Sequence, residues 1–290
     1  MTRRRGERPK IGFRAAALAT VSAVVVGLGG AGVATADPTG GPAGKQWTAT
    51  HDGKQKYAGE SGRTDVPIRM SDGTVLRADI YRPADARQRP VDTRTPVIVN
   101  LTPYTKLLTS LGASVSQHPV LETFLDKVLS KVRLTGPLRG GDDLIGTIRD
   151  KGIKTMMVDD NLIRSGYTQV VVDVRGTGFS QGTWDVFRSR EQMDTIEVIN
   201  WAAAQKWSDG KIGMAGVSYS GINQIYAAKM APKALKAIFP VEPGGDLIRD
   251  VVAPGGGLGV GFLPLWLTLV NATKLIPNVA SMMNGTFDWK

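Results

Sequence analysis

The stretch that most constrains this chain is KIGMAGVSYSG, at residues 211–221. A short apolar run stops at Gly216, and a helix-period pattern of apolar residues starts just after Ser218. A strand, a sharp turn with small residues around one Ser, and then a helix form the context of a nucleophile elbow. Gly216, Ser220 and Gly221 are small enough to let the chain turn back on itself. The alternative interpretation is a glycine-rich turn in which Ser218 only caps the helix.

The residues around this turn predict an alternation of strands and helices. The helix after the turn carries Ile222, Ile225, Tyr226 and Met230 on one predicted face. A second helix is predicted from a capping box, Ser189-x-x-Gln192, to about residue 205. Strand-like runs occupy residues 66–70, 74–81, 95–101, 167–174, 212–215 and 235–241. The first two runs predict a hairpin, and the remainder predicts an α/β fold with a mostly parallel, doubly wound sheet.

The first 36 residues have the pattern of a secretory signal peptide. A basic head is followed by small apolar residues over 15–33 and by an Ala-Thr-Ala cleavage site just before Asp37. A retained membrane anchor is the alternative, but the glycines of the apolar part and the cleavage site favour removal. We therefore expect export, by the Sec route, to the cell envelope or the medium. No stable membrane span should remain after cleavage.

Composition excludes several other classes of function. Removing residues 1–36 takes away six basic side chains and one acidic side chain, which lowers the net charge from +10 to +5. No basic run with interleaved aromatic residues remains, so nucleic acid is not an expected partner. The chain has no Cys, and its two His are His51 and His118. We therefore expect neither a cofactor nor a metal site.

The remaining chain is expected to form four parts. Residues 37–62, rich in Gly, Pro and Thr, read as a linker. The core should cover residues 63–253, interrupted at 107–153 by an inserted segment that contains an amphipathic helix. Residues 254–290 should begin a helical cap, because the apolar run over 263–270 is short and contains a Pro.

Five blocks in the core resemble one family. They are MSDGTVLRADIYRP, NLTPYTK, GYTQVVVDVRGTGFSQG, NWAAAQKWSDGKIGMAGVSYSG and LKAIFP. In this order, over about residues 64–261, they resemble the catalytic domain of the cocaine esterase and X-Pro dipeptidyl-peptidase family of serine hydrolases, which includes the α-amino acid ester hydrolases. The resemblance implies the α/β-hydrolase fold, and a small ester or peptide as the substrate.

The resemblance also implies roles for three residues. Ser218 occupies the position of the nucleophile, and Tyr104 matches a Tyr whose hydroxyl donates to the oxyanion. The backbone N–H of Tyr219 would be the second donor. Asp173, Arg175 and Asp194 also fall in matching blocks, but we expect them to have structural roles, because acids and Arg at strand ends usually pair with backbone or with each other. We do not expect these last three residues to take part in catalysis.

The order of the catalytic triad in this fold is Ser, acid, His, and no His follows Ser218 in this sequence. The resemblance places the acid and the His after the cap. We therefore expect the 290 residues to be a fragment with little activity of its own, and His118 to be a surface or cap residue. The alternatives are a non-catalytic exported binding protein and an envelope protein tethered by its N-terminus. The sequence does not separate esterase from peptidase.

Overall fold

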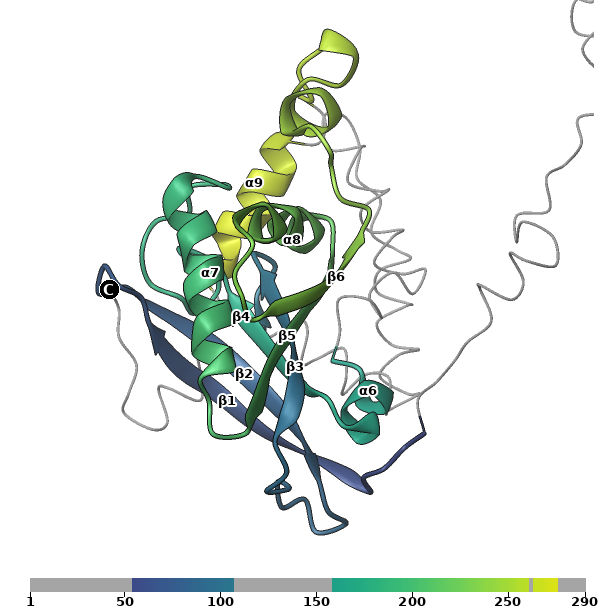
Figure 1. The fold of residues 1–290 in the computed structure, drawn as a ribbon. Coiled ribbons are helices and arrows are strands. Elements are labelled where there is room, and N and C mark those ends of the chain that lie inside the picture. The colour runs from purple at the N-terminus through teal and green to yellow at the C-terminus, as the bar shows by residue number, and fades with distance from the viewer. Residues whose placement is uncertain (1–53, 107–157, 261–262, 276–290) are drawn as a thin grey trace, which may run out of the picture. The chain divides into compact units, whose positions relative to one another are not determined.

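A six-stranded sheet organises the residues that the structure describes, which in this computed structural model are 54–106, 158–260 and 263–275 (Figure 1). The strand order is β1-β2-β4-β3-β5-β6. The strands β1 and β2 form an antiparallel hairpin, β2 also pairs antiparallel with β4, and β4, β3, β5 and β6 are parallel. Their bounds are Gly59–Arg69, Val75–Ala84, Thr95–Thr102, Thr168–Asp173, Ser208–Val217 and Leu235–Val241 for β1 to β6.

The chain changes direction across the sheet between β3 and β5. From β3 the chain passes to β4 on one side, and the next strand, β5, pairs with the other side of β3. In open α/β sheets, the crevice beyond the carboxyl ends of two such strands is the usual place for a ligand. The residues that follow β3 and β5 are therefore brought to one edge of the sheet.

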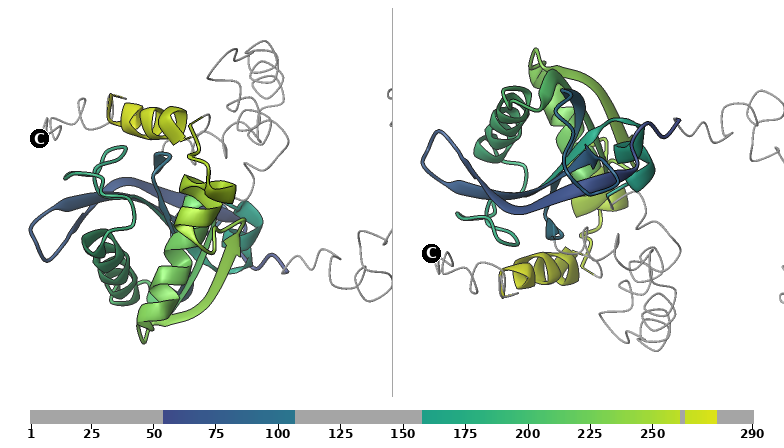
Figure 2. Two further views of the ribbon diagram at one scale, coloured as in Figure 1. Left: turned by 90° about the horizontal axis from the view of Figure 1, so that it is seen from above. Right: turned by 90° about the horizontal axis from the view of Figure 1, so that it is seen from below.

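Helices cover both faces of this sheet (Figure 2). The two long helices, α7 and α8, contact β3 and β5 on one face, and α6 contacts β1 and β2. The bounds are Asp160–Ser165 for α6, Ser189–Ala203 for α7, Tyr219–Met230 for α8 and Leu263–Ala272 for α9. Short turns of π-helix and 3₁₀-helix cover Leu247–Val252, Pro254–Gly256 and Thr273–Leu275. None of the helices in the described ranges is long and apolar enough to cross a membrane.

Apolar side chains that alternate between the two faces of the strands place the main core between the sheet and the helices α7 and α8. On β3, Val97, Val99 and Leu101 are almost fully buried and pack in one cluster with residues of α7 and α8. On β4, Val170 and Val172 belong to the same cluster, whereas Val171 packs against α6 on the opposite face. Because successive side chains of a strand point to opposite faces, the two clusters lie on the two sides of one sheet.

The predicted strands and the mostly parallel sheet are confirmed; β1, β2 and β5 are longer than expected, and β4 is one residue shorter at each end. The first strand starts at Gly59, so ordered structure begins inside the segment 37–62 that was expected to be a linker. The helix α9 is where the start of a cap was predicted. The predicted signal peptide, 1–36, and the whole of the predicted inserted segment, 107–153, lie outside the described residues.

Two predictions about helices are wrong. Arg188, not Ser189, is the N-cap of α7 and makes no side-chain cap bond, while the Gln192 side chain donates to the carbonyl oxygen of Phe187. The predicted apolar face of α8 is wrong for Ile225 and Met230, which are each 41% exposed, whereas Ile222 is buried and Tyr226 packs against the core as predicted. The buried side of α8 includes Ser220, Asn223, Gln224 and Ala227 instead. Polar residues occupy this side because two of them, Ser220 and Gln224, bond to the turn and to neighbouring strands.

Candidate active site

Ser218 forms the sharp turn between β5 and α8. Its backbone has φ 55° and ψ −116°, a conformation that costs a residue with a side chain of the order of 1–3 kcal/mol. The turn is held by hydrogen bonds, because the Ser218 N–H donates to Val241 O at 2.9 Å and the Ser218 carbonyl accepts from the N–H groups of Gly221 and Ile222. The Ser218 side chain is half-buried. The nucleophile elbow predicted from the sequence is therefore the observed local geometry.

Small residues around Ser218 are required by close approach of the backbone. A Cβ on Gly216 would lie 2.5 Å from the Cβ of Ser220, and a Cβ on Gly221 would lie 3.0 Å from Val241 O. The Ser220 hydroxyl donates to Leu101 O at 2.7 Å, which ties the start of α8 to the end of β3. The turn and the strand end beside it therefore form one fixed unit.

Tyr104 lies beside Ser218 although 114 residues separate them in the chain. The Tyr104 hydroxyl donates to Ser218 Oγ at 3.3 Å. Tyr104 follows β3 and Ser218 follows β5, so the two meet at the point where the sheet changes direction. Tyr219 is the first residue of α8, and N–H groups in a first helical turn have no partner within the helix.

This arrangement supplies two parts of an acyl-transfer site. A hydroxyl nucleophile stands at a helix N-terminus, with a phenol donor and a backbone N–H beside it. Two fixed donors stabilise the negative charge that develops on a carbonyl oxygen under attack, and removing one such donor costs about 10²–10³ in rate. The described residues contain neither of the two His, so they show no His that could act as a base for Ser218.

The side chain of Tyr219 points into the core and is held by a buried polar and aromatic cluster. The Tyr219 hydroxyl donates to Glu191 Oε1 and accepts from Trp184 Nε1 at 3.0 Å. The ring of Phe187 stacks on Tyr219 with centroids 3.9 Å apart, and Trp266 of α9 lies 6.1 Å away. Tyr219, next to Ser218, is thus anchored to α7 and lies beside α9.

Burial raises the pKa of Glu191 from 4.5 to about 7, although the Tyr219 hydroxyl and the Phe187 N–H oppose the shift by bonding the carboxylate. Burial and the neighbouring Glu191 raise the pKa of Tyr219 well above 10.0. The folded state therefore holds the Glu191 proton over a pH range in which the unfolded chain has lost it.

This shift predicts a pH dependence of stability that Glu191→Gln should remove. Between pH 4.5 and 7 the folded wild type binds more protons than the unfolded chain, so its free energy of unfolding falls as the pH rises. The loss should reach about 3 kcal/mol, since one pKa unit corresponds to about 1.4 kcal/mol. Urea unfolding at a series of pH values gives the free energy of unfolding of both proteins. The free energy of unfolding of the wild type, minus that of the variant, should decrease as the pH rises from 4.5 to 7. Parallel stability curves would contradict the prediction.

The three residues that were expected to be structural have that role. Arg175 donates from Nε and Nη2 to the two carboxylate oxygens of Asp194, both at 2.7 Å, and pairs with Asp72 at 2.8 Å. Asp173 is fully buried and accepts from the backbone N–H groups of Phe179 and Lys106. Burial raises the pKa of Asp173 to about 7, against the effect of these two donors.

Sequence reasoning did not identify three charged residues near the site. Lys106 and Asp79 form a buried ion pair next to the Tyr104 turn, at 2.8 Å between Nζ and Oδ1. Glu191 was also missed. The available signal was a charged residue at a position where the surrounding strand or helix pattern predicts burial. A charged side chain that is buried in a folded protein requires a partner.

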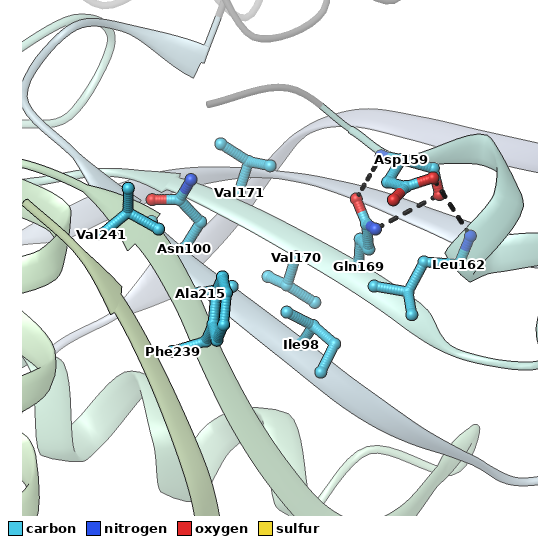
Figure 3. Close-up of a pocket in the computed structure, with 11 residues that line it drawn as sticks. Ile98, Asn100, Asp159, Leu162, Gln169, Val170, Val171, Ala215, Phe239 and Val241 are labelled. Carbon is cyan, nitrogen blue, oxygen red and sulfur yellow. Dashed lines mark hydrogen bonds between the residues drawn. The ribbon is translucent and has the colours of Figure 1, made fainter. Parts of the chain in front are cut away.

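A separate cavity of about 230 Å³ lies against α6 (Figure 3). Its lining is mostly apolar, including Ile98, Val171 and Phe239, and neither Ser218 nor Tyr104 contributes to it. Asn100 Oδ1, which also lines it, is buried without a hydrogen-bond partner among the described residues. No Ser, Thr or Lys lines this cavity, and its one carboxylate, Asp159, caps α6, so the site at Ser218 is the candidate.

Comparison with known proteins gives consistent matches. The family model described as X-Pro dipeptidyl-peptidase (S15 family) matches residues 72–282. The cocaine esterase of a Rhodococcus species is 38% identical over 109 residues, which are 37% of this chain and 19% of that protein. The Xaa-Pro dipeptidyl-peptidase of Lactobacillus delbrueckii is 23% identical over 192 residues, or 57% of this chain and 23% of that protein.

Solved structures agree with the sequence comparison. A CocE/NonD family hydrolase from Staphylococcus aureus superposes with a TM-score of 0.53 and 28% identity, covering 73% of this chain and 33% of that one. The fold is therefore the α/β-hydrolase fold. The matches span between about a fifth and a third of the length of these relatives.

Proposed function

Because the chain belongs to the X-Pro dipeptidyl-peptidase (S15) family, we propose that it forms the nucleophile-bearing part of a serine hydrolase that cleaves an ester or a peptide bond. One observation carries this proposal: the Tyr104 hydroxyl lies 3.3 Å from Ser218 Oγ at the end of β5. That pairing brings the proposed nucleophile and the proposed oxyanion donor together.

In the proposed reaction, Ser218 Oγ attacks the carbonyl carbon of the substrate and loses its proton to a base. The carbonyl oxygen becomes an oxyanion, which accepts from the Tyr104 hydroxyl and the Tyr219 N–H. Collapse of the tetrahedral intermediate expels an alcohol from an ester or an amine from a peptide and leaves an acyl group on Ser218. Water then attacks the acyl carbon and releases the acid. The first steps are the same for esters and peptides. The names of two relatives, cocaine esterase and Xaa-Pro dipeptidyl-peptidase, indicate one of these substrate classes each.

A fluorophosphonate probe tests the proposal on the protein expressed from its complete reading frame. The Ser218 oxygen should displace fluoride from phosphorus, and peptide mass spectrometry should find the adduct on Ser218. The 290-residue chain, assayed in parallel, should label much more slowly if the base comes from elsewhere. A folded complete protein that takes up no probe would instead favour the alternative, a non-catalytic exported binding protein.

We also propose export, on the sequence pattern of residues 1–36. A basic head, a small-residue apolar stretch and the Ala-Thr-Ala site predict cleavage before Asp37. N-terminal sequencing of the protein from the culture medium or envelope should begin at Asp37. A mature protein that still begins at Met1 would refute signal cleavage and favour a retained anchor.

A further inference from the structure

The turn that carries Tyr104 is held in a strained conformation. Residues 102–106 follow β3, and Thr105 in their middle is fully buried with φ 66°, a region that residues other than Gly seldom adopt. The Tyr104 N–H donates to Thr102 Oγ1 at 3.1 Å, and Thr102 O accepts from the Val174 N–H at 3.0 Å. Such a backbone persists only where surrounding bonds fix it.

Lys106 closes this turn with two buried contacts. Its backbone N–H donates to Asp173 Oδ1 at 2.6 Å, and its ammonium lies 2.8 Å from Asp79 Oδ1 on β2. Asp65 is a second acid at 3.7 Å, and the ammonium lies 4.7 Å from the centre of the Phe179 ring. Lys106 is only 3% exposed. A Lys this deeply buried needs a matching charge, so the Asp79 carboxylate fixes where Lys106 and its backbone must lie.

Tyr104 and Lys106 are two residues apart, so the position of one restrains the other. The hydroxyl of Tyr104 stands at the end of a long ring and reaches Ser218 at 3.3 Å. A small rotation of the backbone at the base of that ring moves the hydroxyl by a larger distance. An error of about 1 Å in the position of a catalytic group can cost about 10²-fold in rate.

We propose that Lys106 is a positioning residue for the oxyanion donor: its ion pair with Asp79 and its amide bond to Asp173 hold the 102–106 turn so that the Tyr104 hydroxyl faces Ser218. This inference rests on the proposed function, because it assigns a task to the Tyr104 hydroxyl. The hydrogen bonds of Lys106 go to Asp79 and Asp173 and not to Ser218, so Lys106 acts through the turn.

A double-mutant cycle on the complete protein tests it, with kcat and KM for an ester substrate as readouts. Tyr104→Phe removes the hydroxyl and should lower kcat by about 10²-fold. Lys106→Met combined with Asp79→Asn removes both charges together, which avoids an unpaired buried carboxylate at position 79. We expect this variant to lose about tenfold or more in kcat with little change in KM. In the Tyr104→Phe background the same pair of changes should cost almost nothing further, because no hydroxyl remains to be misplaced.

The matched control is Arg190→Met with Glu197→Gln, an ion pair on α7 whose further contacts are with Ser71 of the hairpin turn and with Asp194 rather than with residues 102–106. Its effect on kcat should be the same with or without the Tyr104 hydroxyl.

If the Lys106 variant does not fold, Asp79→Asn alone enters the same cycle. If the Lys106 and Asp79 changes lower kcat by the same factor in the Tyr104→Phe background as in the wild type, the inference is overturned and the proposed function is left intact. A Tyr104→Phe protein with wild-type kcat overturns both.

Discussion

Ser218→Ala should lower kcat/KM for ester hydrolysis by the complete protein by about 10⁴-fold or more. Removing the nucleophile of a serine hydrolase leaves only the contribution of substrate binding and of the oxyanion donors. Here those donors, the Tyr104 hydroxyl and the Tyr219 N–H, should stay in place, because the turn is held by backbone bonds to Val241, Gly221 and Ile222. The variant should therefore fold and bind substrate with nearly normal affinity. Initial-rate kinetics measures the loss of kcat/KM, and circular dichroism shows whether the variant is folded.

The control for this prediction is Ser220→Ala, two residues away. The Ser220 hydroxyl is buried and donates to Leu101 O, so its loss should cost about 1 kcal/mol of stability while the reaction continues. A Ser218→Ala protein with activity close to that of Ser220→Ala would show that another residue is the nucleophile. The proposed function would then have to be abandoned.

Gly216→Ala should destabilise the protein by about 2–3 kcal/mol and slow fluorophosphonate labelling by about 10²-fold or more. The added methyl group would lie 2.5 Å from Ser220 Cβ, an atom that cannot move aside without its backbone, and 3.2 Å from Asn100 Oδ1. The end of β5 or the start of α8 must shift, and Ser218 lies between them. Thermal unfolding and the labelling rate of the same preparations measure both effects.

Gly213→Ala on the same strand is the matched control. There the new methyl group would meet mainly the Cδ1 atom of Ile98, at 2.9 Å, and the nearest backbone atoms are 3.9 Å away. Because the end of the Ile98 side chain can rotate, we expect a loss below about 1 kcal/mol and a labelling rate close to that of the wild type. Equal effects at Gly213 and Gly216 would mean that the elbow has no special need for a small residue.

The protonation of Glu191 affects how these experiments should be run. Since the pKa of Glu191 is raised to about 7, stability comparisons among variants should be made at one pH well away from that value. At such a pH a change in stability reports the substitution itself and not a shifted titration.

The sequence by itself determined the local features of this protein. The strands, α7, α8 and the sharp turn at Ser218 follow from patterns within about ten residues, because hydrophobic period and small residues restrict the backbone locally. The family could be recognised for the same reason, since its blocks lie at such turns and strand ends. Local patterns failed where a side chain had a choice of partners. The N-cap of α7 is Arg188, because the Gln192 side chain bonds to Phe187 O and does not form the expected box with Ser189.

Only the tertiary structure decided which distant residues meet. The strand order places β3 beside β5, and that pairing brings Tyr104 within 3.3 Å of Ser218. The same packing joins Lys106 to Asp79 and Glu191 to Tyr219, contacts between residues 27 and 28 positions apart. A sequence shows that a buried charge or hydroxyl needs a partner, but several candidates satisfy that need equally. The partner is selected by burial of the whole sheet against its helices, which is a property of the complete fold.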